Sequence, residues 1–354
     1  MKQLFEYGEK NIVSDLIYAT FPHLNSLHGD AVNVSTSSYT SFSFSTDPCP
    51  EPIVSYFDKA NRYYHYGFLT VVINYSDLAA CGSEPIGILL STVMPNQMID
   101  CEYQSFLNGV RDACNLWGGR LLGGNIKDGK AFSVTGTSIG GHTYGTVFTR
   151  RGMNSGDAIC TVGDLGMFWF GILQLIEGKT VAELDDYTRS FLLAPRPKIK
   201  ESQVLAKSGL ITTGMDNSDG IIGCLYELAE LNNLTLHIDD KQFVPNTGLA
   251  QFCEKKGIDY RNLLLSFGGW DLVFACNPDD ISELKNQFLQ NNLSFNVIGY
   301  STSNIGERVI FHKDNHEYSV KDFSSKRFDK HSYFSFGLDS FMKQFYVNNF
   351  EEII

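Results

Sequence analysis

Oxygen-bearing side chains recur in short clusters along this 354-residue chain, and aspartate is the residue type that the clusters share. In sequence order the clusters are His28-Gly29-Asp30, Ser45-Thr46-Asp47, Asn74-Tyr75-Ser76-Asp77 and Asp216-Asn217-Ser218-Asp219-Gly220. Carboxylates that converge in space repel one another unless a cation lies between them. Hard oxygen ligands suit Mg²⁺, which usually also holds substrate phosphates. If these segments meet in the fold, the chain is predicted to hold Mg²⁺ and a nucleoside triphosphate.

Each cluster also has an ordinary structural explanation. Asp47 follows an expected strand and could be a surface turn residue, whereas Ser76 could cap a helix or satisfy a turn. The segment from Asp216 to Gly220 precedes an expected helix and could simply begin it. A helix N-terminus also favours anions, so phosphate and metal carboxylates can share such a position. The residues alone leave both interpretations open.

Two glycine pairs lie between the aspartate clusters, in Gly123-Gly124-Asn125 and Gly268-Gly269-Trp270-Asp271. Paired glycines allow a backbone to approach a ligand closely. The chain contains no G-x-x-x-x-G-K-[ST] loop and no G-x-G-x-x-G after its first strand, which excludes the common nucleotide-binding loops. It also lacks H-E-x-x-H and G-x-S-x-G, so neither a zinc protease nor a serine hydrolase is supported.

Composition narrows the classes of partner. The net charge is −12, with 40 acidic and 28 basic residues, and this balance argues against nucleic acid. The eight cysteines form no C-x-x-C pair, which favours reduced thiols in a cytosolic protein. The first seven residues lack the apolar core of a signal peptide. The longest apolar run, about 167–176, is too short to span a membrane. We expect a cytoplasmic protein without a nucleic-acid or membrane partner.

The order of expected elements indicates a mixed α/β chain of two domains, since 354 residues are many for one core. A boundary is expected near Thr149, giving domains 1–148 and 149–354. The expected strands cover 39–46, 86–93, 120–122 and 132–139. The segment 156–163 is expected to form a turn, a strand and a turn, and short apolar segments at 263–265 and 272–275 flank the second glycine pair. The expected helices cover 68–80, 103–117, 167–177, 199–206, 221–231 and 341–350.

The aspartate and glycine segments, taken in order, resemble the superfamily of aminoimidazole-ribonucleotide synthase, selenophosphate synthetase, the hydrogenase-maturation carbamoyl dehydratase and thiamine-monophosphate kinase. The kinase is the nearest match, and the similarity runs from Gly29 to about Phe274. The matched segments also include Thr149-Arg150, Gly156-Asp157 and Arg196-Pro197.

This resemblance implies an α/β (α+β) two-domain synthetase-like fold that forms a homodimer through its N-terminal sheets. It implies that ATP and Mg²⁺ bind in a cleft that the C-terminal α/β domain completes. By position, the implied metal ligands or their neighbours are Asp30, Ser45, Thr46, Asp47, Asp77, Asp216 and Asp219. The implied nucleotide-binding residues are Gly123, Gly124, Asn125, Arg150 and Ser218. The implied catalytic residues are Asp77, Arg150 and Asp219.

Departures from the kinase pattern remove acidic residues from the metal site and change the residues of the acceptor site. One aspartate, Asp30, stands where the kinase has two, and Asn125 replaces an aspartate. The segment after Asp47 lacks the histidine that helps to hold thiamine phosphate, and Trp270 replaces the glutamate after the second glycine pair. We therefore expect transfer of the ATP γ-phosphate to a small-molecule acceptor that need not be thiamine phosphate. Two alternatives stay open: an ATP-dependent synthetase of the cyclo-ligase or dehydratase type, acting through a phosphorylated carbonyl oxygen, and a non-catalytic nucleotide-binding protein.

Overall fold

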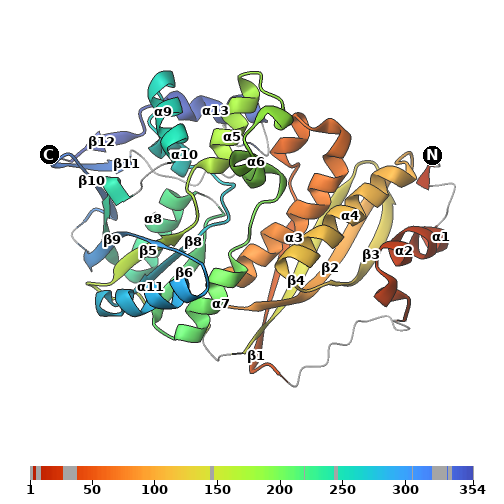
Figure 1. Ribbon diagram of the computed structural model, residues 1–354, viewed down its shortest axis with the longest axis horizontal. Coiled ribbons are helices and arrows are strands. Elements are labelled where there is room, and N and C mark those ends of the chain that lie inside the picture. Colours follow the sequence, from red (N-terminus) through yellow and green to blue (C-terminus); the bar gives the residue numbers. More distant parts are fainter. Residues whose placement is uncertain are drawn as a thin grey trace.

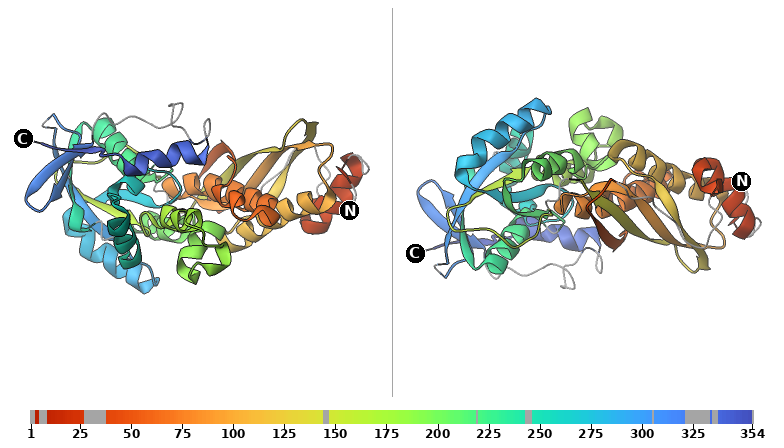
Figure 2. Two further views of the ribbon diagram at one scale, coloured as in Figure 1. Left: turned by 90° about the horizontal axis from the view of Figure 1, so that it is seen from above. Right: turned by 90° about the horizontal axis from the view of Figure 1, so that it is seen from below.

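The computed structural model describes residues 3–4, 9–26, 38–143, 147–218, 220–242, 246–304, 306–320, 333 and 337–353. Two separate sheets organise these residues, one in the N-terminal and one in the C-terminal part of the chain (Figure 1). The two parts lie side by side along the longest axis of the molecule (Figure 2). The mixed α/β class expected from the sequence is confirmed.

The N-terminal sheet has four strands in the order β1-β4-β2-β3. Their bounds are β1 Ser41–Pro48, β2 Glu84–Pro95, β3 Leu121–Gly129 and β4 Ser133–His142. β2 and β3 run parallel, whereas β4 is antiparallel to both β1 and β2. Two long helices, α3 (Arg62–Ala80) and α4 (Asp100–Trp117), pack against each other beside this sheet.

Glycines allow the close contact between α3 and α4. A Cβ atom on Gly67 would lie 2.0 Å from the carbonyl oxygen of Phe106, and one on Gly109 would lie 2.1 Å from that of Tyr64. Neither helix can therefore carry a larger residue at its crossing point. The close crossing fixes the position of α3 on the sheet, and α3 carries Asp77.

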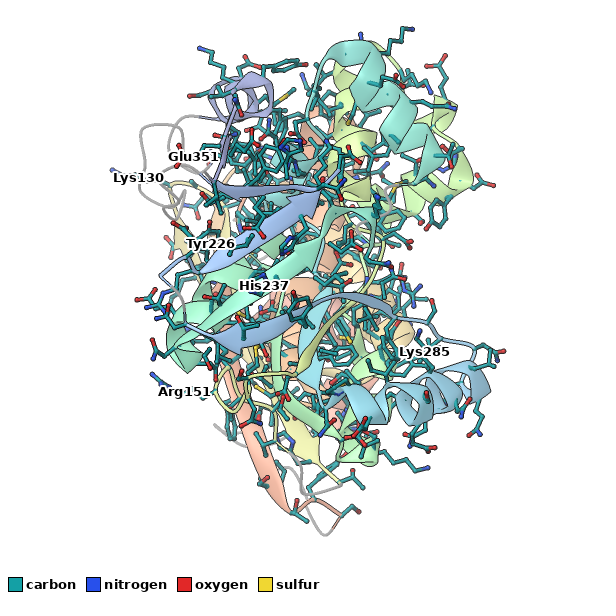
Figure 3. The ribbon with its side chains drawn as sticks, turned by 90° about the vertical axis from the view of Figure 1, so that its left-hand side faces the viewer. Lys130, Arg151, Tyr226, His237, Lys285 and Glu351 are labelled. Atoms are coloured by element: carbon teal, nitrogen blue, oxygen red, sulfur yellow. The ribbon has the colours of Figure 1, made fainter. Side chains whose placement is uncertain are left out.

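The C-terminal sheet has eight strands in the order β12-β11-β10-β7-β9-β5-β8-β6. The bounds are β5 Ala158–Val162, β6 Ile211–Asp216, β7 Leu234–Asp239, β8 Leu272–Cys276, β9 Asn296–Ser303, β10 Val309–Lys313, β11 His316–Val320 and β12 Phe350–Glu352. β5 and β8 are buried along their whole length, which is typical of strands covered on both faces. The outer part of the sheet is seen in Figure 3, where His237 marks β7.

Helices cover both faces of the central strands in this second sheet. α8 (Ile221–Asn232) packs its apolar residues against Ile159 of β5 and Val273 of β8. The opposite face of the same strands shares a core with residues of α7 (Ile199–Ser208) and α11 (Ile281–Gln290). The remaining helices are α1 Glu9–Ile12, α2 Tyr18–Thr20, α5 Met167–Ile176, α6 Asp186–Leu193, α9 Thr247–Lys256, α10 Arg261–Leu264 and α13 Leu338–Met342.

Most expected elements are present, with three differences. α3 begins six residues earlier than the expected 68, and β3 continues through the glycine pair to Gly129. The expected closing helix over 341–350 is wrong. α13 ends at Met342, a 3-10 turn follows over Lys343–Tyr346, and Phe350 begins edge strand β12. Phe350 packs edge-on against Phe311 of β10, so pairing with the sheet overrides the local apolar pattern.

The C-terminal end of α3 joins the two parts. The hydroxyl of Ser202 on α7 donates to the carbonyl oxygen of Ala79 at 2.6 Å, and the backbone N–H of Phe148 donates to the carbonyl oxygen of Cys81 at 3.1 Å.

None of the described helices combines the length and apolar character that a membrane span requires.

Candidate functional site

Asp77 lies near the C-terminal end of α3, where β1 runs alongside the helix. The hydroxyl of Ser45 on β1 donates to the Asp77 carboxylate. One turn earlier, the side-chain oxygen of Asn74 accepts from the backbone N–H of Asp47 at 3.2 Å, while its amide donates to the carbonyl oxygen of Thr70 at 2.8 Å. These bonds hold the end of β1, and hence Asp47, beside Asp77.

Asp216 reaches the same place from the last residue of β6. Its carboxylate accepts a 2.8 Å hydrogen bond from the hydroxyl of Ser76, which precedes Asp77 in α3. Asp216 is 2% exposed, and its carbonyl oxygen accepts from the thiol of Cys224 at 3.2 Å. Residues 140 positions apart in the sequence are thereby joined.

The electrostatics of the cluster are those of crowded acids. Burial raises the pKa of Asp77 above its usual 3.8, and the nearby charge of Asp216 raises it further. Hydrogen bonds from Ser45 and Asp47, together with the charge of Arg150, act in the opposite direction on this pKa. A cation placed between the carboxylates would relieve the repulsion.

Arg150 is the cation that faces this cluster. Its guanidinium Nη1 lies 2.6 Å from Oε1 of Glu227 on α8, and both side chains are nearly half exposed. Burial opposes the charged form of Arg150, but Glu227 and Asp216 raise its pKa overall. The guanidinium therefore remains positive at the mouth of an acidic site. Glu227 was not predicted from the sequence, since its apolar-patterned helix gives no sign of a partner on another element.

Thr46 lies on the opposite face of β1 from Ser45 and Asp47, because side chains alternate along a strand. Its hydroxyl donates to the carbonyl oxygen of Gly136 at 2.9 Å and lies 3.0 Å from the hydroxyl of Thr137. The side chain of Thr46 thus belongs to the outer sheet face. Only its backbone carbonyl could contribute to a site beside Asp77.

The first glycine pair lies on the far edge of the N-terminal sheet from Asp47. In the strand register Asp47 is opposite Gly136, Gly136 is opposite Leu90, and Leu90 is opposite Gly124. Three strand spacings amount to about 14 Å. One chain therefore does not bring Gly123, Gly124 and the exposed Asn125 to the aspartates.

Strand pairing explains why residue 124 is a glycine. A Cβ atom at this position would lie 2.0 Å from the carbonyl oxygen of Leu90, and the residue has a positive φ of 156°. Pairing between β2 and β3 is sufficient to require glycine here, with or without a ligand.

Two predicted site residues, Asp30 and Asp219, lie outside the described residues. Ser218 is described and stands just before α8, two residues after Asp216. Within the described ranges, no three histidine, cysteine, aspartate or glutamate side chains are grouped closely enough to hold a metal ion. The described part of the cluster is thus an incomplete ligand set.

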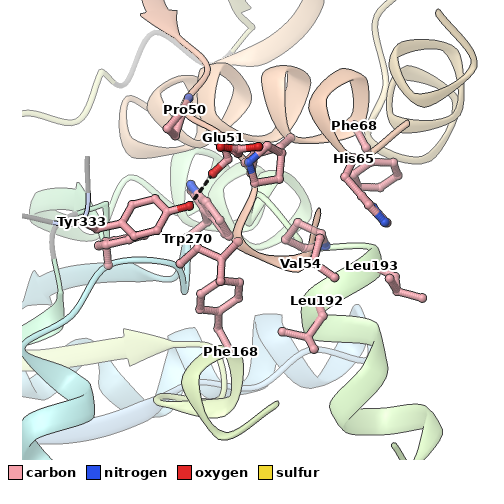
Figure 4. Close-up of a pocket in the computed structure, with 15 residues that line it drawn as sticks. Pro50, Glu51, Val54, His65, Phe68, Phe168, Leu192, Leu193, Trp270 and Tyr333 are labelled. Atoms are coloured by element: carbon pink, nitrogen blue, oxygen red, sulfur yellow. Dashed lines mark hydrogen bonds between the residues drawn. The ribbon is translucent and has the colours of Figure 1, made fainter. Parts of the chain in front are cut away.

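An apolar pocket lies between the segment that follows β1 and residues of the C-terminal part of the chain (Figure 4). Its volume is about 50 Å³, and its wall includes Pro50 and Glu51, three and four residues after Asp47. The remaining lining residues are Pro52, Ile53, Val54, His65, Phe68, Leu69, Phe168, Leu192, Leu193, Pro195, Phe267, Trp270 and Tyr333. The phenol of Tyr333 donates to the carbonyl oxygen of Glu51 at 2.9 Å and fastens the rim.

Trp270 forms part of this wall in a strained conformation. Its φ is +47°, which is unusual for a bulky residue. The indole is 8% exposed and meets the ring of Phe168 edge-on, with ring centres 6.0 Å apart. The next residue, Asp271, is buried and lies 3.2 Å from the ammonium of Lys198. This ion pair helps to hold the strained backbone, and such strain is frequent at ligand sites.

Comparison with known proteins gives family matches for both parts of the chain. A model described as "AIR synthase related protein, N-terminal domain" matches residues 28–142, and its C-terminal counterpart matches 154–312. The thiamine-monophosphate kinase of Nitrosopumilus maritimus (strain SCM1) is 27% identical over 270 residues, which are 73% of this chain and 81% of the kinase.

Two solved structures share the fold. The thiamine-monophosphate kinase of Stenotrophomonas maltophilia K279a superposes with a TM-score of 0.72 at 22% identity, covering 84% of this chain and 95% of that one. AaThiL complexed with AMPPCP and TMP gives a TM-score of 0.64 at 24% identity, covering 88% and 95%. The two family models match the chain in order and together cover most of its length. The chain therefore belongs to the AIR synthase related family.

Proposed function

We propose that the protein is a Mg²⁺-dependent enzyme that transfers the γ-phosphate of ATP to a small-molecule acceptor. The observation that carries this proposal is the proximity of Asp77 on α3 to Asp216 on β6, with the end of β1 that carries Asp47 held against α3 and the charge of Arg150 acting on the same acids. The fold is shared with AaThiL, whose structure contains the ATP analogue AMPPCP. Curated relatives over most of the chain are thiamine-monophosphate kinases.

The described carboxylates fit a Mg²⁺ site in chemistry, since they are hard oxygen ligands whose mutual repulsion raises the pKa of Asp77. Asp47, Asp77 and Asp216 would supply part of the metal's ligand set, with the Ser45 hydroxyl supporting Asp77. Asp30 and Asp219 are added by their sequence positions. Bound Mg²⁺ would neutralise charge on the phosphate oxygens.

Arg150 would neutralise charge on the transferred phosphoryl group. Phosphoryl transfer depends mainly on positioning and electrostatic stabilisation. The ion pair with Glu227 orients the guanidinium from outside the cluster, and the partial exposure of both groups leaves room for a nucleotide. Ser218, just before the N-terminus of α8, would lie along the nucleotide.

The apolar pocket, of about 50 Å³, is proposed to hold a small apolar part of the acceptor, because Glu51 and Pro50 on its rim follow Asp47 by a few residues. No lysine or arginine is among its described lining residues. An acceptor phosphate, as in thiamine phosphate, would find no cation there. This favours an acceptor with an apolar body and an uncharged oxygen nucleophile.

The same lining favours the synthetase alternative as a second candidate. In that reaction a carbonyl oxygen of the acceptor bonds to the γ-phosphorus while the bond from phosphorus to ADP breaks. A second nucleophile then attacks the activated carbon, and inorganic phosphate leaves. ADP is released in both reactions, but phosphate remains on the product only in the kinase.

A homodimer through the N-terminal sheets is also proposed. The outer face of β1 presents Phe44, 68% exposed, and Phe42, 36% exposed. On this face Asn125 of edge strand β3 is exposed as well. A second copy covering this face would bury the phenylalanines and could bring Asn125 to the partner's aspartates. We also propose a cytoplasmic location, which fits the eight free cysteines.

Product analysis with MgATP and a panel of small acceptors tests the proposal. ADP release that depends on both Mg²⁺ and acceptor is the expected result. Phosphorus NMR then distinguishes a phosphorylated product from free phosphate, and so the kinase from the synthetase. Asp77→Asn should abolish ADP release, whereas Asp186→Asn, at a residue 91% exposed on α6, should retain it. Nucleotide binding without turnover of any acceptor would favour the non-catalytic alternative.

A further inference from the structure

A second cavity, of about 360 Å³, adjoins the apolar pocket at Pro195, which lines both. Its wall comes from the end of β5, from α6, from the loop leading into α7 and from the loop between α11 and β9. The cavity is of the size that small-molecule sites usually have. None of Asp47, Asp77, Asp216 and Arg150 lines it.

Two charged side chains at the start of α7 are buried against this cavity. The side chain of Lys198 is 6% exposed and that of Glu201 is 7% exposed. Lys198 is the N-cap residue of α7, and Glu201 lies in the first turn of that helix. Burying a charge is costly unless it is well paired, so each must have partners of opposite charge.

The side chains of Lys198 and Glu201 make only long hydrogen bonds and ion pairs with their partners in the described part of the chain. Lys198 Nζ lies 3.2 Å from Asp271 and donates to the carbonyl oxygen of Arg196 at 3.4 Å. Glu201 accepts from the guanidinium of Arg196 at 3.3 Å. Charge-assisted hydrogen bonds are normally about 2.7–2.9 Å long. Both buried groups can therefore form shorter bonds with a ligand in the cavity.

Positive and negative side chains line the cavity in equal number. Arg196 and Lys198 are cations, and Asp164 and Glu201 are anions, while Asp271 contacts Lys198 from behind and does not line the cavity. Phosphate or a nucleotide would meet two carboxylates here. A molecule with one ammonium and one carboxylate matches both pairs, and Phe191 and Phe295 add apolar surface for a side chain.

We propose that this cavity binds a small zwitterion of the amino-acid class. Its carboxylate would contact Lys198 and Arg196 near the positive N-terminal end of α7. Its ammonium would contact Glu201 and Asp164. Nothing in this proposal depends on the phosphate-transfer activity.

Calorimetric titration of the full chain with each of the twenty amino acids tests the proposal, with inorganic phosphate as the anion control. At least one amino acid should bind at millimolar concentration or below. Its decarboxylated amine and its deaminated acid should each bind roughly tenfold or more weakly, because each lacks one ionic contact. Absence of binding by every amino acid, or binding of phosphate or the deaminated acid with equal affinity, would overturn the proposal.

Variants at the exposed rim locate the binding without disturbing the buried pair. Arg196→Gln, at a side chain 52% exposed, and Asp164→Asn should each weaken the best amino acid roughly tenfold or more. Arg189→Gln on α6 is the matched control, because its guanidinium pairs with Asp186 and does not line the cavity. Unchanged affinity in Arg196→Gln and Asp164→Asn would place the ligand elsewhere and refute the assignment.

Discussion

Replacing Asp77 by asparagine should stabilise the metal-free protein while abolishing its activity. Burial and the charge of Asp216 raise the pKa of Asp77 in the folded protein, so the ionised carboxylate opposes folding. Each unit by which this pKa is raised corresponds to about 1.4 kcal/mol of lost stability. Asparagine has nearly the same shape, carries no charge and still offers an oxygen to the hydroxyl of Ser45.

The pH dependence has a definite sign. Below the unfolded pKa of about 3.8, Asp77 is protonated in both states and resembles asparagine. As the pH rises from there through the raised folded pKa, the unfolded chain ionises first and wild-type stability falls relative to Asp77→Asn. Above the folded pKa the difference stays constant, with Asp77→Asn the more stable protein.

Urea unfolding between pH 4 and pH 8, with a chelator present, measures this difference. Asp186→Asn, at an exposed carboxylate, is the matched control and should follow the wild type. A wild type that equals or exceeds Asp77→Asn in stability at pH 7 would refute the reasoning. The crowding of acids inferred around α3 would then be absent.

Three further changes have defined outcomes. Ser76→Ala removes the 2.8 Å bond to buried Asp216 and should lower the free energy of unfolding by about 1.5–3 kcal/mol in urea titrations; no loss would mean that the bond is absent in solution. Trp270→Ala empties the pocket wall beside Phe168 and should cost about 3–5 kcal/mol while raising the acceptor KM and leaving nucleotide affinity unchanged. Phe44→Asp should convert a dimer into a 39.6 kDa monomer in sedimentation; a dimer that persists would move the interface away from β1.

The sequence placed the strand that carries Asp47 and the helix that carries Asp77, but it did not predict β6, the strand that ends at Asp216. Alternation of phenylalanine and serine predicted β1, and helical periodicity predicted α8. The same periodicity could not reveal that Ser76 bonds to Asp216, because such contacts depend on how the two parts of the chain pack. It also misassigned the segment that ends at Phe350, where pairing in the sheet decides the conformation.

The acceptor pocket was the part least accessible to sequence reasoning. Phe168, Trp270 and Tyr333 meet there from distant positions, and each would be an ordinary core aromatic residue by pattern alone. At Gly124 the sequence suggested a ligand where strand packing alone explains the residue. A Cβ atom there would collide with the carbonyl oxygen of Leu90, so glycine is required with or without a ligand.

The most direct test of the central claim is the melting temperature with a non-hydrolysable ATP analogue, in the presence of Mg²⁺ or of a chelator. Ligand at about 100 times its Kd should add roughly 2.7 kcal/mol of stability, which corresponds to a rise of roughly 4 °C for a chain of 354 residues. We predict this rise only with Mg²⁺, and predict its loss in Asp77→Asn. A melting temperature that the analogue leaves unchanged with Mg²⁺, or raises equally with the chelator, would contradict a Mg²⁺-nucleotide site at Asp47, Asp77 and Asp216.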